Sequence, residues 1–93
     1  MTGWLIGHPK YKDIWAASSI WNGVLDMSYM VTATDIPDWI WACCLNKELT
    51  EFHSYTAEDN LKFFNMSPIS QIKNVTTPTL LVVGTHDYRV PPH

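Results

Sequence analysis

An acid, a histidine and an arginine lie close together near the end of the sequence. Residues 84–89 (GTHDYR) directly follow the uncharged run 79–83 (TLLVV). A carboxylate at the rim of an apolar layer can hydrogen-bond a histidine, hold it in one tautomer and stabilise its protonated form, as the acid of a Ser-His-Asp triad does. Alternatively, Asp87 is only a turn former, because an aspartate in a loop often bonds its own backbone. Both interpretations stay open on position and composition alone.

The neighbouring polar residues have structural explanations. Arg89 either binds a substrate carboxylate with its two-pronged guanidinium group or forms an ion pair that anchors the loop, and we favour the ion pair. His86 is expected to point away from Asp87, and His93 is too near Asp87 in the sequence for the histidine of a triad. Six serines lack the flanking glycines of an exposed nucleophile turn and are interpreted as structural: Ser18, Ser19, Ser28, Ser54, Ser67 and Ser70.

Metal and redox chemistry have no support in the sequence. Cys43 and Cys44 are the only cysteines. A disulfide between adjacent residues would be strained, and no further metal ligands occur at suitable spacing. Both cysteines are predicted to be buried as small apolar side chains. No metal and no cofactor are therefore expected.

Residues 35–45 (DIPDWIWACCL) read as a helix that is largely covered by protein. Asp35 is a suitable N-cap, Pro37 is tolerated in the first turn, and Asp38 suits the positive end of the helix dipole. Trp39 and Trp41 either line an apolar pocket for an acyl group or pack in the core. We favour the core for Trp41 and leave Trp39 open.

The remaining elements are read from their boundaries. Residues 2–6 resemble the end of a helix stopped by glycine and proline, and its short length suggests that earlier turns lie outside the sequence. Residues 14–21 are favoured as a strand over a helix because an Asn-Gly turn signal follows. Residues 57–64 form a helix that Thr56 can cap and that Ser67-Pro68 breaks. Residues 79–83 have the pattern of a strand buried on both faces.

Composition excludes several classes of protein. The chain has 93 residues, enough for one small domain, and 46% of them are hydrophobic, which is too apolar for a disordered segment. The net charge of −3 without a basic stripe gives no support for nucleic-acid binding. No apolar run is long enough to cross a membrane, and the first residues lack the features of a signal peptide. A cytoplasmic location is expected.

Helix, break and buried strand in succession favour an α/β fold with a parallel sheet. In such sheets, functional groups gather beyond the carboxyl ends of the strands. Asp87 is expected to occupy that place.

Several stretches together resemble the prolyl oligopeptidase family of serine peptidases. Residues 77–81 (TPTLL) and 84–91 (GTHDYRVP) are similar to the strand and acid loop of that family, and residues 3–9 (GWLIGHP) to the helix after its nucleophile turn. Residues 34–39 (TDIPDW) and 67–69 (SPI) resemble one branch, the acylaminoacyl-peptidases. The resemblance covers nearly all of the chain.

The resemblance implies an α/β-hydrolase fold, with residues 1–93 forming part of the catalytic domain between the nucleophile helix and the acid loop. It implies that Asp87 is the catalytic acid. The implied substrate is a short N-acylated peptide, no nucleic acid or membrane is involved, and the whole protein could be homo-oligomeric.

The family's G-x-S-x-G turn is absent from this sequence. The triad order Ser, Asp, His implies that the serine lies before Met1 and the histidine after His93, so the sequence resembles an internal piece of a hydrolase. Within the enzyme class, dipeptidyl or prolyl specificity stays open. The competing hypothesis is a non-catalytic remnant or a protein-interaction module that binds through exposed aromatic side chains.

Overall fold

The computed structural model describes residues 1–46 and 55–92. In chain order, its elements are the α-helix α1 (Thr2–Gly7), the 3₁₀ helix η1 (Lys12–Ile14), the strand β1 (Ser18–Trp21), the α-helices α2 (Met27–Ala33), α3 (Asp38–Leu45) and α4 (Ala57–Asn65), the 3₁₀ helix η2 (Pro68–Asn74) and the strand β2 (Thr79–Val82).

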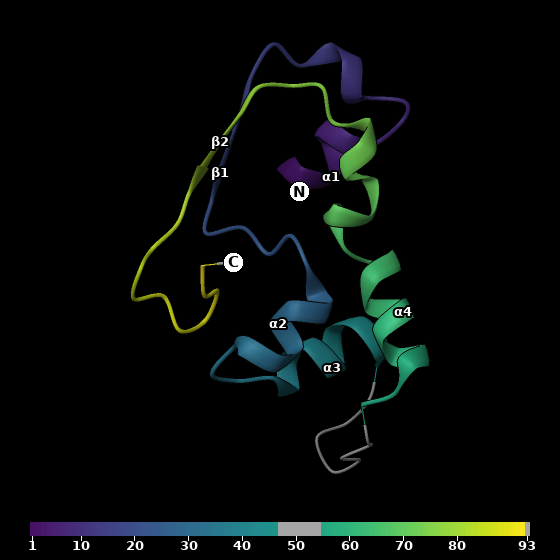
Figure 1. Ribbon diagram of the computed structural model, residues 1–93, viewed down its shortest axis with the longest axis vertical. Coiled ribbons are helices and arrows are strands. Elements are labelled where there is room, and N and C mark those ends of the chain that lie inside the picture. The colour runs from purple at the N-terminus through teal and green to yellow at the C-terminus, as the bar shows by residue number, and fades with distance from the viewer. Residues whose placement is uncertain (47–54, 93) are drawn as a thin grey trace.

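The two strands form a parallel pair, as the sequence predicts. β1 and β2 run side by side, with Ser18 opposite Thr79 and Trp21 opposite Val82 (Figure 1). The prediction of a strand over residues 14–21 is correct only for its second half. Pairing begins where the Ser18 N–H donates to the carbonyl of Pro78, 2.9 Å away. Pro78 has no N–H of its own, so it cannot donate to a longer ladder.

The prediction that residues 79–83 are buried on both faces is wrong for this chain. Leu80 and Leu81 remain 61% and 54% exposed. All helices of the described chain lie on one side of the strand pair (Figure 1), so none of them covers its other face.

Two predicted helices are confirmed, and a third begins later than expected. α1 ends at Gly7, and α4 begins with a complete capping box in which Thr56 and Asp59 bond each other's backbone N–H groups. α3 begins at Asp38, after Pro37 at the N-cap position, and has no side-chain cap. Asp35 as N-cap is therefore wrong: its carboxylate binds Arg89 instead.

The apolar core lies where α2, α3 and α4 meet. Its buried members, one or two from each helix, are Met30, Val31, Ile40 and Phe63. Sequence reasoning missed α2, although its signal was present. Asp26 accepts hydrogen bonds from the N–H groups of Ser28 and Tyr29, so it is a regular N-cap before an apolar run. It also missed η2.

The predicted burial of the cysteines and of α3 is largely wrong. Cys43 is exposed and Cys44 is partly buried, and both are free thiols. Burial raises the pKa of the Cys44 thiol, and the neighbouring Cys43 adds to this effect. In α3, Ile40 is fully buried, whereas Ala42 is exposed. The helix lies at the margin of the core, so only one of its sides is covered.

Two features are absent from the described residues. Across residues 1–46 and 55–92, no helix has the length and apolar character needed to span a membrane. The same residues contain no group of three or more His, Cys, Asp or Glu side chains that could hold a metal ion.

Candidate active site

The segment after β2, residues 84–90, contains the predicted catalytic acid, and we call it the acid loop. It begins two residues beyond Val82, the last residue of β2, at the carboxyl end of the parallel pair. The Asp87 N–H donates to the carbonyl of Gly84, 3.1 Å away, which closes a tight turn. The loop therefore lies where an open α/β sheet gathers its functional groups.

The Asp87 carboxylate is held by the backbone that follows it. Its Oδ1 atom accepts hydrogen bonds from the N–H of Arg89 at 3.0 Å and from the N–H of Val90 at 2.8 Å. Its Oδ2 atom accepts no hydrogen bond from any residue in the described part of the chain. Half of the carboxylate thus fixes the orientation of the side chain, and the other half can accept a further donor. Both the turn-former and the acid interpretations of Asp87 are compatible with this geometry.

Asn22, directly after β1, connects the ends of the two strands. Its N–H donates to the carbonyl of Val82 at 2.8 Å, and its side-chain Oδ1 accepts from the N–H of Gly84 at 2.7 Å. Asn22 has a φ of +42°, in the left-handed region that asparagine tolerates better than most residues. The start of the acid loop is therefore fixed to the carboxyl end of β1.

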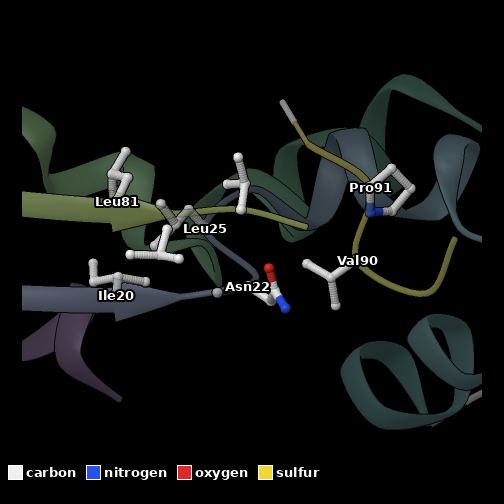
Figure 2. A pocket seen from close by; sticks show the side chains of 9 residues that line it. Ile20, Asn22, Leu25, Leu81, Val90 and Pro91 are labelled. Atoms are coloured by element: carbon white, nitrogen blue, oxygen red, sulfur yellow. The ribbon is translucent and has the colours of Figure 1, made fainter. Parts of the chain in front are cut away.

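A small apolar hollow lies beside this junction. Figure 2 shows Ile20 and Leu81 projecting from the two strands, with Asn22 and Val90 at the other end of the hollow. Its volume is about 20 Å³, which is enough for little more than one water molecule. It is too small for an acyl group. Val90 also packs against the core cluster, so the end of the acid loop is anchored to the apolar core.

The linker between α2 and α3 binds the acid loop from the other side. The Thr34 hydroxyl donates to the carbonyl of Arg89 at 2.9 Å, and the Asp35 N–H donates to the carbonyl of Tyr88 at 3.0 Å. The Arg89 guanidinium group donates to Asp35 through Nε at 2.8 Å and Nη2 at 3.4 Å. The expectation that Arg89 forms an anchoring ion pair is confirmed.

This ion pair shifts the pKa values of its two side chains in opposite directions. The hydrogen bond from Arg89 lowers the pKa of Asp35, with the positive charge of Arg89 adding to it and slight burial opposing it. The same hydrogen bond raises the pKa of Arg89. Both side chains are about half exposed, at 57% for Arg89 and 44% for Asp35. The pair is therefore ionised at neutral pH and is accessible to solvent.

The other candidates from the sequence lie apart from Asp87 or in structural roles. His86 shares a hydrogen bond with the adjacent Thr85 hydroxyl at 3.1 Å, and no hydrogen bond joins it to Asp87 within the described chain. Ser18 bonds Thr79 across the strand pair, and the buried Ser67 donates to the carbonyl of Phe63. Ser54 and His93 lie outside the described residues.

The two candidate tryptophans pack beside the core. The Trp41 ring meets Phe63 edge-on, with 5.1 Å between ring centroids, which confirms its predicted packing role. Trp39 also contacts the core cluster. Its indole N–H is buried and has no acceptor among the described residues. Neither ring lines the hollow beside the acid loop.

Sequence reasoning missed Asn22 and Thr34 as residues of this site. The Asn-Gly pair at 22–23 predicts a turn, but a turn signal does not reveal that the Asn22 side chain reaches residue 84. Thr34 belongs to the TDIPDW stretch, but nothing in that stretch indicates its partner, which lies 55 positions away.

Comparison with known proteins gives a consistent result along the chain. The model of the prolyl oligopeptidase family matches residues 1–93. The acylamino-acid-releasing enzyme of Arabidopsis thaliana is 43% identical over 91 residues, and acylamino-acid-releasing enzyme 1 of Oryza sativa subsp. japonica is 41% identical over 93; each alignment covers 98% of this chain. The acylamino-acid-releasing enzyme of Mus musculus is 35% identical over 89 residues, or 94% of this chain.

The chain spans 12% of the length of each of these relatives. Its two parallel strands and flanking helices have the architecture of part of an α/β-hydrolase domain. On the match over its whole length, this chain belongs to the prolyl oligopeptidase family, a family of serine peptidases.

Proposed function

We propose that these 93 residues are part of the catalytic domain of a serine peptidase that releases N-acylated amino acids from the ends of short peptides, and that Asp87 is the acid of its triad. The observation that carries this proposal is the position of Asp87 beyond the carboxyl end of β2, with one carboxylate oxygen held by two backbone N–H groups. The relatives named acylamino-acid-releasing enzymes support the substrate class.

In this mechanism, a serine attacks the carbonyl carbon of the acylated residue while a histidine takes the serine's proton and later gives it to the leaving amine. The sequence has no G-x-S-x-G turn to present such a serine, and no histidine among the described residues hydrogen-bonds Asp87. Asp87 would accept a hydrogen bond from the imidazole Nδ1–H through Oδ2. This contact would hold the tautomer in which Nε2 faces the serine, and it would stabilise the imidazolium ion.

The proposal is tested with Asp87→Asn in the full-length protein that contains this sequence. Turnover of an N-acetylated amino-acid nitroanilide should show a kcat lower by up to about 10⁴-fold, with KM nearly unchanged, because asparagine favours the wrong imidazole tautomer. Asp13→Asn is the matched control, since Asp13 is an exposed aspartate that pairs with its neighbour Lys12 in η1. Its kcat should equal that of the wild type. A kcat for Asp87→Asn equal to the control would remove Asp87 from the triad.

An interaction module is the second candidate function. Trp21 is 73% exposed and Leu80 is 61% exposed, so the strand pair presents apolar surface that a partner could cover. The neighbouring coding sequence separates the two candidates. A G-x-S-x-G motif in frame before Met1 and a histidine loop after His93 would support the peptidase, whereas stop codons on both sides would support the module.

A further inference from the structure

The Thr34-Asp35 pair makes four polar contacts with the two residues that follow Asp87. The contacts are the Thr34 hydroxyl on the Arg89 carbonyl, the Asp35 N–H on the Tyr88 carbonyl, and the two guanidinium bonds from Arg89 to the Asp35 carboxylate. Two of them use backbone groups of the acid loop, and two use its only arginine. The linker between α2 and α3 therefore restrains the acid loop at consecutive residues.

Arg89 connects these contacts to the catalytic carboxylate. Its N–H donates to Asp87 Oδ1, its carbonyl accepts from Thr34, and its side chain binds Asp35. If the backbone at residue 89 turned, the hydrogen bond to Asp87 would lengthen. The orientation of the Asp87 carboxylate thus depends on contacts that Arg89 makes with residues 54 and 55 positions before it in the chain.

The ion pair is suited to orientation more than to overall stability. Because both side chains are about half exposed, solvent screens their attraction, and such pairs contribute little to the free energy of unfolding. Arginine nevertheless has a planar fork whose two N–H groups fit one carboxylate, which fixes direction as well as distance. Thr34, by contrast, is 8% exposed, so its hydroxyl bond belongs to the protein interior.

We propose that Asp35 is a positioning residue: through Arg89 it holds the acid loop so that Asp87 presents Oδ2 to the catalytic histidine. This inference rests on the proposed function. It assigns Arg89 to the support of the acid and not to the substrate, because its Nε and Nη2 groups are already bound to Asp35. It also means that residues 34–35 support catalysis by holding the acid loop in place.

The test uses the full-length protein with Asp35→Ala, Asp35→Glu and Asp87→Asn. Asp35→Ala should lower kcat about tenfold and change KM less than twofold, and Asp35→Glu should recover most of the loss because it restores a carboxylate. The concentration of active sites is titrated in each sample, so that misfolded protein does not count. Asp35→Asn, which keeps the side-chain volume, replaces the alanine variant if that variant fails to fold.

The pH profile of kcat/KM supplies a readout that a merely structural role would not move. A misplaced Asp87 stabilises the imidazolium ion less, so the pKa of the catalytic histidine falls. The acid limb of the profile should therefore shift to lower pH in Asp35→Ala. Glu58→Gln is the matched control, since it breaks an exposed ion pair of 2.7 Å with Lys62 on α4, far along the chain from the acid loop. It should leave kcat and the profile unchanged.

The outcomes separate the two proposals. If Asp87→Asn loses activity while Asp35→Ala behaves like Glu58→Gln, the positioning role is overturned and the proposed function stands. If Asp35→Ala raises KM at constant kcat, Arg89 acts on the substrate and the positioning role is again overturned. If Asp87→Asn has no effect, the proposed function itself fails.

Discussion

The connection between Asn22 and Gly84 gives a prediction whose size follows from the structure. Asn22 contributes two separable features: a left-handed backbone with φ of +42°, and a side-chain oxygen that accepts from the Gly84 N–H at 2.7 Å. Asn22→Gly keeps the first feature and removes the second. Asn22→Ala removes the side-chain oxygen and makes the left-handed backbone more costly.

The expected magnitudes differ accordingly. Loss of one hydrogen bond costs about 0.5–1.5 kcal/mol, which corresponds to about 2- to 13-fold faster exchange of the Gly84 amide hydrogen in Asn22→Gly. Alanine in a left-handed conformation costs about 1–2 kcal/mol more. The exchange in Asn22→Ala should therefore be faster than in wild type by about one to two and a half orders of magnitude, unless the turn relaxes to another conformation.

Hydrogen exchange followed by mass spectrometry of the full-length protein, on peptides that cover Gly84, measures both effects. Asn46→Ala is the matched control, because Asn46 also has a positive φ, +52°, but ends α3. It should accelerate exchange at the end of α3 and leave Gly84 unchanged. Equal exchange at Gly84 in Asn22→Gly and Asn22→Ala would show that the left-handed turn carries no strain. Exchange unchanged in both would refute the connection.

Three further predictions concern other parts of the chain. The acid loop should loosen in acid: the pKa of Asp35 lies below its ordinary value of 3.8, so the stabilisation by the ion pair is present above about pH 3.8 and is lost as the pH falls through the lower folded value. As the pH falls below about 3.8, the difference in the exchange rate of the Val90 amide between wild type and Asp35→Asn should disappear. A difference that persists at pH 2 would contradict this prediction. Thr56→Ala removes half of the capping box of α4 and should cost about 1 kcal/mol, seen as about fivefold faster exchange of the Asp59 amide, with Thr32→Ala as an exposed control. The isolated 93-residue chain should show no nitroanilide hydrolysis above buffer and no sharp thermal unfolding transition, because Leu80 and Leu81 remain exposed on the strand pair; a cooperative transition of the monomer would contradict this.

Local signals predicted the elements whose ends are marked by side chains or by residues with restricted backbones. Thr56 marked the start of α4, and Ser67-Pro68 marked its end. These predictions succeeded because a cap or a proline acts on the backbone within a few residues of itself. The N-cap at Asp35 failed for the opposite reason, since a carboxylate with a suitable local role can bind a distant partner instead.

Burial was the property that local patterns predicted least well. Residues 79–83 are apolar enough for an interior strand, yet Leu80 and Leu81 are more than half exposed in the described chain. Free cysteines are usually buried, yet Cys43 is exposed on α3. An apolar residue is buried only if another helix or strand covers it. The sequence of the residue's own helix or strand does not show which partner that will be.

The sequence by itself determined the family, the parallel α/β architecture and the position of Asp87 in a loop after a strand, because these depend on residue types in order along the chain. Only the tertiary structure showed that Asn22 and the Thr34-Asp35 pair hold that loop. Their partners lie 53 to 62 positions away, and contacts at that separation exist only once the strands have paired and α2 and α3 have packed together.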